Sequence, residues 1–496
     1  MSVALAAVER ASESRDLEAA LRSMRFAQRS WAEEPIGIRT GIIQRFRHAV
    51  AANAKNLAGV VQNVRVHSSV AEILSSEVLP LLDACHFAEE RAAELLRIVK
   101  PKRKDRPFWL AGTGVELRRE PFGTVLIIAP GNYPLVLSGV QTIQALVAGN
   151  AILMKPAPGA SLVTHRFRDL LIEAGLNAPL FQVIDEDPEW AHRAIELGVD
   201  KIILTGSELA GREVLRKASE TITPVTCELS GCDAMIVLPG ADLDLAARAL
   251  RFALRLNAAQ TCMRPHRVFV HSQIAHAFKC RVIEATRDLR IPLAARAISK
   301  LIDLVKRATQ RGAIQITGTV FEDDSASPHV LENGDFTSEL WQSDLFAPVL
   351  VFSSFDSERD LLENVEACRY GLGACIFGTD EQAQRLAARM NTGFVLINDV
   401  IVPTADPRFP FSGRKRSGFG VTRGAEGLLE FTRLKAVSIR RSGYRHYEDE
   451  HATDEDLFAG TIAAVHGRGL LKRTRGAAAA FRAVRIRMQS REKVSS

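Results

Sequence analysis

The sequence of 496 residues has no apolar run that approaches the length of a membrane-spanning helix. Such a helix needs about 20 consecutive, mostly apolar residues. The opening stretch, MSVALAAVERASESRDLEAA, scatters acidic and basic residues where a signal peptide has an apolar core. We therefore expect neither a membrane span nor secretion, and a cytoplasmic location is the default.

The sequence also lacks paired cysteine motifs. Seven cysteines, at positions 85, 227, 232, 262, 280, 368 and 375, form no CxxC pair and no Cys/His set with zinc-like spacing. Their odd number and scatter argue against a secreted disulfide framework. We expect reduced thiols and no metal site.

A general charge surplus is absent as well, because the net charge of +6 belongs to one end of the chain. Residues 467–496 carry nine Lys or Arg and one Glu, so the rest of the chain is close to neutral. The basic balance is thus no evidence that the main body binds nucleic acid. With 47% hydrophobic and 25% charged residues, the chain has the composition and length of a folded protein of two or three domains.

The hydrophobic pattern indicates an α/β fold. Residues 21–97 are predicted to be helical, because apolar residues recur at three- and four-residue steps. After an exposed strand at 115–119, short buried strands alternate with helices, which indicates parallel sheets with ligands at the carboxyl ends of the strands. The expected strands are 124–128, one ending at 155, 201–204, 234–238, 268–270 and 393–398, and the expected helices include 161–175, 242–256 and 380–390.

Beyond residue 441 the chain changes character. The stretch YEDEHATDEDLF is acidic and LLKRTRGAAAAFRAVRIRMQSREK is basic, with few large apolar residues to build a core. The plain interpretation is a solvated, disordered extension. The alternative is a basic helix that contacts anionic lipid, nucleic acid or a partner protein.

Four segments carry residues suited to covalent carbonyl chemistry, which needs a thiolate, a base and oxyanion donors. Cys262 follows Gln-Thr, but a free cysteine is more often a core residue. Asn132 lies at a strand-to-helix turn, where Asn is common for structural reasons. Glu228 precedes a strand and reads locally as a loop carboxylate. Gly206 and Ser207 begin a helix, and suit either a phosphate or a plain N-cap.

Seven motifs favour the catalytic interpretation of these residues over the structural one. In chain order they are EPFGTVLIIAPGNYP, ALVAGNAILMKP, ILTGSELAGREV, CELSGCDAMIV, NAAQTCMRPHRVFV, DLFAPVLVF and PFSGRKRSGFG. In this order they resemble the motifs of the aldehyde dehydrogenase superfamily, with the closest likeness to its class 3 and fatty-aldehyde branch. The resemblance covers residues 21–440.

This resemblance implies an aldehyde dehydrogenase-like α/β fold. A Rossmann-type NAD(P)-binding domain would comprise 1–113 and 123–228, and an α/β catalytic domain 229–412. A small β oligomerisation arm with a C-terminal segment would comprise 114–122 and 413–442, followed by a charged, disordered tail at 443–496. Since exposed edge strands seek a partner, we expect a homodimer.

The resemblance also implies catalytic roles. Cys262 would be the nucleophile and Glu228 the general base, while Asn132 and the backbone N–H of Cys262 would hold the oxyanion. An aldehyde would be oxidised to a carboxylic acid through a thiohemiacetal and a thioester, with NAD or NADP as cofactor and no metal.

The resemblance further implies cofactor contacts. Lys155 would contact the adenosine ribose, and Ser207, with Gly206, the pyrophosphate. Asp344 and Phe346 would hold the nicotinamide riboside, and Leu229 would also belong to the cofactor site.

The chain departs from the family pattern at several positions. Gly131 stands where the family has Trp, and Cys232 where it has Lys. Asp344 replaces a Glu. Pro158 replaces the Glu that normally holds the 2′-hydroxyl of NAD, so use of NADP is plausible.

Two alternatives remain open from the sequence. A CoA-acylating relative would release the acyl group to CoA rather than to water, although Glu228 weighs against it. A catalytically weak dinucleotide-binding scaffold would explain the altered cofactor motifs, although intact Cys262, Glu228 and Asn132 weigh against that.

Overall fold

The computed structural model describes residues 2–441 and 453–494. They divide into two compact units. The larger unit contains residues 2–98 and 118–435, and the smaller contains residues 99–117 and the described residues from 436 onward. The larger unit holds two open sheets and all the candidate site residues.

The first open sheet has six strands in the order β18-β6-β5-β2-β3-β4. All neighbours are parallel except β18, which joins β6 antiparallel. The central strands are buried along their length, because their apolar, β-branched residues are covered on both faces. The bounds are β2 (Thr124–Ile128), β3 (Ala151–Lys155), β4 (Phe181–Val183), β5 (Lys201–Thr205), β6 (Val225–Glu228) and β18 (Gly418–Phe419).

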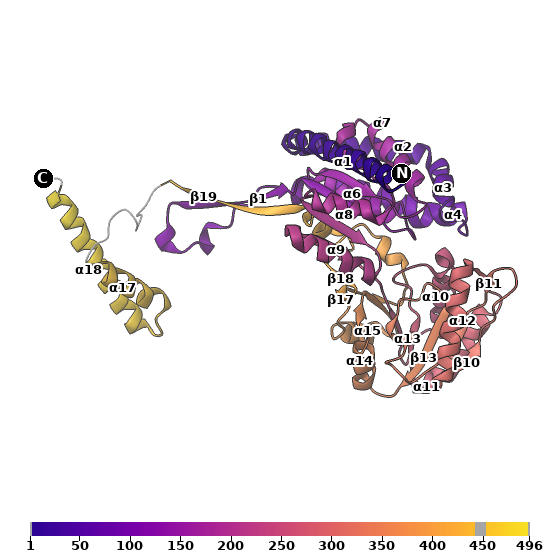
Figure 1. Ribbon diagram of the computed structural model, residues 1–496. Coiled ribbons are helices and arrows are strands. Elements are labelled where there is room, and N and C mark those ends of the chain that lie inside the picture. Colours follow the sequence, from indigo (N-terminus) through magenta and orange to yellow (C-terminus); the bar gives the residue numbers. More distant parts are fainter. Residues whose placement is uncertain (1, 442–452, 495–496) are drawn as a thin grey trace. The chain divides into compact units, whose positions relative to one another are not determined.

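Helices cover this sheet, and the N-terminal helices add a further layer (Figure 1). Every residue of α6 is buried, since this helix packs between the sheet and α5. The bounds are α1 (Ser2–Glu33), α2 (Ile36–Ala52), α3 (Ala54–Gln62), α4 (Val70–Ile73), α5 (Leu79–Leu95), α6 (Val136–Val147), α7 (Ser161–Glu173), α8 (Pro188–Glu196), α9 (Glu208–Thr221) and α16 (Gly424–Leu429).

The second open sheet has seven strands in the order β10-β12-β13-β8-β7-β15-β16, with only β10 antiparallel to its neighbour. It has its own hydrophobic core. Its strands are β7 (Ala234–Val237), β8 (Arg267–His271), β10 (Ile314–Thr317), β12 (His329–Glu332), β13 (Val349–Phe355), β15 (Gly373–Phe377) and β16 (Phe394–Ile397). The surrounding helices are α10 (Leu243–Arg255), α11 (Ser272–Thr286), α12 (Ala295–Gln310), α14 (Glu358–Glu366) and α15 (Asp380–Ala387).

The parallel α/β architecture predicted from the sequence is confirmed. The bounds of the expected strands agree with the observed ones to within two residues, and those of the expected helices to within three. Residues 229–233 join the last parallel strand of the first sheet, β6, to the first strand of the second, β7. This short connection brings Glu228 close to the second sheet, where the cysteine loop lies.

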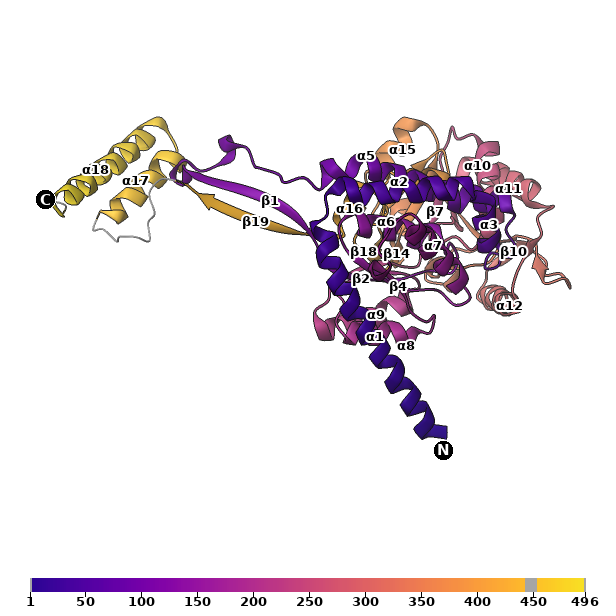
Figure 2. The ribbon, with the colours of Figure 1, turned by 90° about the horizontal axis from the view of Figure 1, so that it is seen from above.

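The prediction for the C-terminal segment needs correction. We expected no ordered structure in 443–496, but the described part of it forms α17 (Asp454–His466) and α18 (Leu470–Val494). The alanine-rich stretch of α18 has high helix propensity, and packing against α17 supplies the tertiary support that a lone helix lacks. The two expected arm strands pair as β1 (Thr113–Pro121) and β19 (Thr432–Arg440) in a separate two-stranded sheet (Figure 2).

Candidate active site

Cys262 lies in a loop between the short helix η5 (Leu256–Ala259) and strand β8. Asn257, Ala258 and Ala259 have φ of 49°, 51° and 63°, a left-handed region that residues other than glycine seldom adopt. Such strain persists only where the surroundings hold it, and it collects at functional sites. The half-buried Cys262 thus follows a turn that its environment must maintain.

Gly231 follows the strand that carries Glu228 and packs against the cysteine loop. A Cβ at Gly231 would lie 2.2 Å from the carbonyl oxygen of Cys262, a distance that no real side chain accepts. The connection 229–233 therefore runs directly against the backbone of Cys262. Glycine is needed here for close approach rather than for an unusual φ.

Asn132 follows β2 and directs its amide toward the cysteine loop. Its Nδ2 donates to the carbonyl oxygen of Gln260 at 3.1 Å, and its Oδ1 accepts from the backbone N–H of Tyr133 at 3.1 Å. The Tyr133 hydroxyl lies 2.7 Å from the Oγ1 of Thr261. The structure therefore brings Asn132 together with the residues just before Cys262, as its expected role requires.

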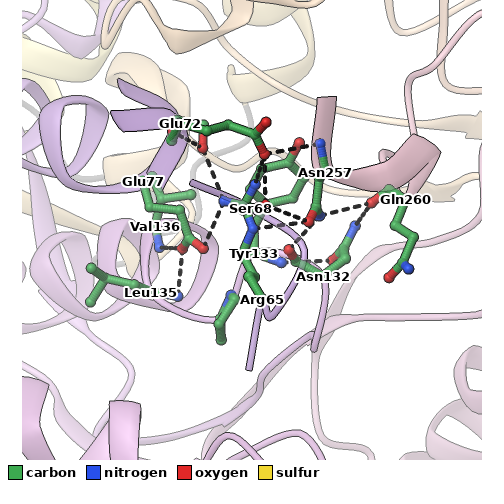
Figure 3. Close-up of polar contacts among 12 residues, drawn as sticks. Arg65, Ser68, Glu72, Glu77, Asn132, Tyr133, Leu135, Val136, Asn257 and Gln260 are labelled. Carbon is green, nitrogen blue, oxygen red and sulfur yellow. Dashed lines mark hydrogen bonds and ion pairs between the residues drawn. The ribbon is translucent and has the colours of Figure 1, made fainter. Parts of the chain in front are cut away.

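A buried polar network holds this arrangement (Figure 3). The Nδ2 of Asn257 donates to the main-chain oxygen of Asn132 at 2.8 Å. In turn, the Nε of Arg65 donates to the Oδ1 of Asn257 at 2.9 Å. Arg65 also pairs with Glu72 at 2.8 Å and with Glu77 at 3.1 Å. Arg65, in the loop between α3 and α4, and the carboxylates that follow it thus fix both Asn132 and the strained turn.

Glu77 ties the network to the start of α6. Its Oε2 accepts the backbone N–H groups of Leu135 and Val136 at 2.8 and 2.9 Å. Burial raises the pKa of Glu77, while Arg65 and these two N–H groups act against the rise. Sequence reasoning missed Arg65, Glu72 and Glu77, since charged residues in a helical region carry no local signal. Asn257 opens the motif NAAQTCMRPHRVFV, but no role was predicted for its side chain.

Glu228 is the last residue of β6 and is only 4% exposed. The Oγ1 of Thr422 donates to its Oε2 at 3.2 Å, while its Oε1 is buried without a hydrogen bond from the described residues. Burial raises the pKa of Glu228, and Arg423 and Thr422 oppose the rise. A buried carboxylate with one free oxygen and a raised pKa is suited to accept a proton from water.

Arg423 is a charged member of the site that the motifs did not indicate. Its Nη1 donates to the carbonyl oxygen of Thr404 at 2.6 Å, and its guanidinium carbon lies 5.1 Å from the centre of the Phe411 ring. Burial lowers the pKa of Arg423, and the nearby Glu228 and Cys262 raise it. Arg423 thus places positive charge near both catalytic candidates.

The surroundings of Cys262 disfavour its thiolate form. Burial raises the pKa of Cys262 well above its ordinary value, and the carboxylates of Glu228, Asp344 and Asp233 add to the rise, against Arg423. Removing its proton therefore requires a base or a nearby positive charge.

The residues expected at the pyrophosphate lie where α9 begins. Ser207 caps the helix, and its Oγ accepts from the backbone N–H of Ala210 at 3.2 Å. The N–H of Gly206 donates to the carbonyl oxygen of Glu228 at 3.0 Å. Leu229 is buried against Gly211, where a Cβ would lie 2.7 Å from its side chain. The N-cap interpretation of Ser207 therefore holds, and a capped helix start still attracts phosphate.

Lys155 ends β3 and is buried, which lowers its pKa, while the carboxylates of Glu186, Asp187 and Asp185 oppose that effect. Glu186 accepts from the backbone N–H of Gly159 and from the hydroxyl of Ser161, both at 2.9 Å. An acidic side chain thus faces Lys155 although Pro158 replaces the family's Glu. Nothing in the sequence motif indicated Glu186.

Asp344 and Phe346 line the same cavity as Gln260 of the cysteine loop. Asp344 accepts hydrogen bonds from the Ser230 side chain and the Gly231 backbone, and burial raises its pKa to about 7. Phe346 is 40% exposed. Asp344 is therefore joined to the connection that packs on Cys262.

Two cavities open on either side of the cysteine loop. One, of about 1140 Å³, is lined by Ser207, Asp344, Phe346 and Gln260 among others. The other, of about 750 Å³, is lined by Tyr133, Met263 and Arg423 among others. Gln260, two residues before Cys262, thus lines the larger cavity, and Met263, the residue after it, lines the smaller one.

No group of three or more His, Cys, Asp or Glu side chains within 2–441 and 453–494 is placed to hold a metal ion. The candidate residues are instead organised around a thiol, an amide and a carboxylate. This set, with a separate cavity beside a helix start, has the parts needed to oxidise a carbonyl through a covalent intermediate.

Comparison with known proteins gives the family. The model described as "Aldehyde dehydrogenase family" matches residues 2–437, and the chain belongs to this family. A Mycolicibacterium smegmatis protein named "Putative succinate-semialdehyde dehydrogenase", with NADP(+) in its name, is 29% identical over 86% of this chain and 85% of its own. The 4,4'-diapolycopene aldehyde oxidase of a Methylomonas species is 29% identical over 83% of this chain and 79% of its own.

The fold is shared with solved structures. The NADP-dependent glyceraldehyde-3-phosphate dehydrogenase of Bacillus halodurans C-125, complexed with NADP, superposes with a TM-score of 0.79. It is 25% identical, and the match covers 86% of this chain and 91% of that one. The family, the fold and the enzyme class expected from the motifs are thus confirmed. The narrower likeness to the class 3 and fatty-aldehyde branch is not confirmed by these relatives.

Proposed function

We propose that this enzyme oxidises an aldehyde to a carboxylic acid, with NAD+ or NADP+ as hydride acceptor and Cys262 as nucleophile. The main support is the position of the cysteine loop, whose Gln260 lines one cavity and whose Met263 lines the other. An aldehyde in the smaller cavity and a dinucleotide in the larger one would meet at Cys262.

The Cys262 thiol first loses its proton to solvent, a loss that the nearby Arg423 guanidinium favours, and the Sγ of the thiolate then forms a bond with the carbonyl carbon. One hydrogen of the Asn132 amide is engaged by Gln260. Its other hydrogen, together with the backbone N–H of Cys262, is available to the developing oxyanion. A donor of this kind contributes about 3–4 kcal/mol in comparable acyl chemistry.

Water then releases the acyl group. The bound dinucleotide supplies the hydride acceptor for the oxidation, which leaves the acyl group on the Sγ of Cys262 as a thioester. Glu228 takes a proton from water through its free Oε1, the resulting hydroxide adds to the acyl carbon, and the C–S bond breaks. The acid leaves and the thiolate is restored.

The residues of the larger cavity suit a dinucleotide. Ser207 stands at the start of a 14-residue helix whose free N–H groups favour pyrophosphate. Asp344 and Phe346 line the same cavity near the cysteine loop and would hold the nicotinamide riboside. We assign Lys155 to the adenosine ribose, and Gly206 and Leu229 to the adjoining turn.

The smaller cavity favours an aldehyde with an apolar body. Its lining includes Phe252, Ile291, Ile401 and Val402, which supports the likeness to the class 3 and fatty-aldehyde branch. An aldehyde that carries a carboxylate is the second candidate. The exposed guanidinium of Arg255 in the same lining favours it, as does the name of the M. smegmatis relative.

Three further features belong to the proposal. The division into a cofactor domain up to residue 228 and a catalytic domain at 229–412 is supported by the two sheets. A homodimer through the β1 and β19 arm is supported by its two-stranded sheet, in which the second edge of β1 is bridged to Val99 at Leu117 and the sheet has no third strand among the described residues. A cytoplasmic location is supported by seven free thiols. Separately, no helix among the described residues is long and apolar enough to cross a membrane.

One experiment tests the proposed function. NADH and NADPH formation is followed with aliphatic, aromatic and carboxylate-bearing aldehydes, with and without CoA, for the wild type and Cys262→Ala. We expect cofactor reduction by the wild type without CoA and none by the variant. A wild type no faster than Cys262→Ala on every aldehyde would leave only the scaffold alternative, and strict dependence on CoA would establish the CoA-acylating alternative.

A further inference from the structure

The hairpin of α17 and α18 lies outside the part of the chain that the family explains. The family match ends at residue 437, and the hairpin begins at Asp454. Gly467 to Gly469 form the turn between its two helices, which pack closely against each other (Figure 2). Its function must therefore be inferred from its own residues.

The interface between the two helices is made of backbone and small side chains. A Cβ at Gly460 would lie 2.6 Å from the backbone nitrogen of Ala480, and one at Gly476 would lie 2.6 Å from that of Ala464. Ala483 of α18 is buried as well, with 3% of its surface exposed. Glycine and alanine therefore let the two backbones touch, as small residues do between helices in lipid.

The large apolar side chains of the hairpin lie outside this interface. A water-soluble hairpin places such side chains between its helices and polar ones outside. In this hairpin small residues lie between the helices instead, and the exposed fractions of the large apolar side chains run from 39% to 80%. These side chains are Phe458, Ile462, Val465, Leu470, Leu471, Phe481, Val484 and Ile486.

Positive charge accompanies the exposed apolar side chains on α18. Residues 470–494 contain eight Lys or Arg and one Glu. Arg475, Arg482 and Arg485 are exposed. Clusters of Lys and Arg are attracted to anionic membrane surfaces, and exposed apolar side chains beside them can enter the boundary below the phosphates.

We propose that the α17–α18 hairpin binds the surface of a membrane that contains anionic lipid. Its apolar side chains enter the boundary between headgroups and acyl chains, and its Arg and Lys residues contact lipid phosphates. A nucleic acid would engage only the cations and leave eight large apolar side chains in water. A second copy of the hairpin offers only the three acidic residues in the first turn of α17 and the one Glu of α18 against the eight Lys or Arg of each α18.

The proposal is tested by co-sedimentation of the full-length protein with lipid vesicles. One set contains phosphatidylcholine alone, and the other contains phosphatidylcholine and phosphatidylglycerol in equal amounts. We expect binding to the mixed vesicles only, and weaker binding as salt is added. Equal binding to both sets, or to neither, would overturn the proposal.

Matched variants locate the binding surface. The triple change Arg475→Gln, Arg482→Gln and Arg485→Gln removes three cations, at about fivefold in affinity for each, so we expect a loss of about a hundredfold. The control changes three exposed arginines of the larger unit, namely Arg22→Gln, Arg287→Gln and Arg359→Gln. Equal losses in both triple variants would show that overall charge, not the hairpin, carries the binding.

The apolar contribution has its own pair of variants. Phe481→Ser, at a side chain 70% exposed on α18, should weaken binding about tenfold. Phe26→Ser, at a side chain 77% exposed on α1, should leave binding unchanged. Turnover of a small water-soluble aldehyde and the far-ultraviolet circular dichroism spectrum should match the wild type in both, which shows that the fold is intact.

The competing occupant gives a different result. Light scattering without lipid should show the same assembly for the wild type and Phe481→Ser. A smaller assembly for Phe481→Ser, with no vesicle binding by the wild type, would mean that a second copy of the chain covers this face instead.

Discussion

The network centred on Arg65 predicts that a conservative change at a residue outside the lining of the substrate cavity lowers turnover. Arg65 makes four hydrogen bonds with its guanidinium, to Asn257, Ser76, Glu77 and Glu72. The variant Arg65→Lys keeps the positive charge beside the two carboxylates. A single ammonium lacks the flat fork of a guanidinium, so it cannot reach Asn257 and both carboxylates together.

The structure sets the magnitude. Hydrogen bonds to charged groups contribute about 1.5–3 kcal/mol each, so losing one or two lowers the free energy of unfolding by about 2–4 kcal/mol. In Arg65→Lys the side chain of Asn257 loses the hydrogen bond from Arg65, so Asn257 holds the main chain of Asn132 less firmly. If the Asn132 amide loses half of the ~3 kcal/mol typical of an oxyanion donor, kcat falls about tenfold.

Arg47→Lys is the matched control. Arg47 makes two hydrogen bonds of 2.8 Å to the two carboxylate oxygens of Glu89, away from the cysteine loop. This change should lower the midpoint of thermal unfolding modestly and leave kcat unchanged. For Arg65→Lys, steady-state kinetics should show the loss in kcat with an unchanged KM for the dinucleotide. A kcat equal to that of the control would refute the positioning role of Arg65.

Three other predictions follow from the site. Glu228→Gln should retain a burst of one reduced cofactor per site while steady turnover falls about 10²–10⁴-fold, because water loses its base; stopped-flow absorbance detects both. Arg423→Met should move the acid limb of the kcat profile to higher pH. Burial already raises the pKa of Glu228 and Arg423 opposes that rise, so without the cation the base stays protonated to a higher pH; a limb at the wild-type position would contradict this. Glu186→Gln should raise kcat/KM for NADP+ relative to NAD+ by about tenfold, because it removes a negative charge that faces Lys155 and repels a 2′-phosphate; equal ratios would show that Glu186 lies away from the ribose.

The sequence predicted the two parallel sheets because their strands are short, buried and apolar. The alternation with helices is regular between Thr124 and Thr205 and returns after Ala234. The region around α11 and α12 escaped prediction, and its strand β10 is short, largely exposed and antiparallel to β12, so it lacks the buried apolar run of the other strands.

The candidate site was predictable only where residues fall within motifs. Cys262, Glu228 and Asn132 stand in such motifs, and the structure places them around one loop. Arg65 and Arg423 do not, because their roles depend on contacts between helices or loops far apart in the sequence. A motif names the residue that reacts, while the surrounding charges and hydrogen bonds appear only in the fold.

The C-terminal segment shows a different limit. Charge and a low content of large apolar residues favoured disorder there, as they usually do. The helices pair through Gly460 and Gly476, whose value lies in close backbone approach and not in apolar burial. Composition alone does not report this kind of packing.

The most direct test of the covalent mechanism is the mass of the trapped enzyme. Glu228→Gln is mixed with hexanal and NAD+, quenched in acid, digested and examined by mass spectrometry. The mechanism predicts a hexanoyl group on the peptide that contains Cys262, and no such group on Cys232 or Cys368. An acyl group on another cysteine, or full turnover with Cys262 unmodified throughout, would contradict it.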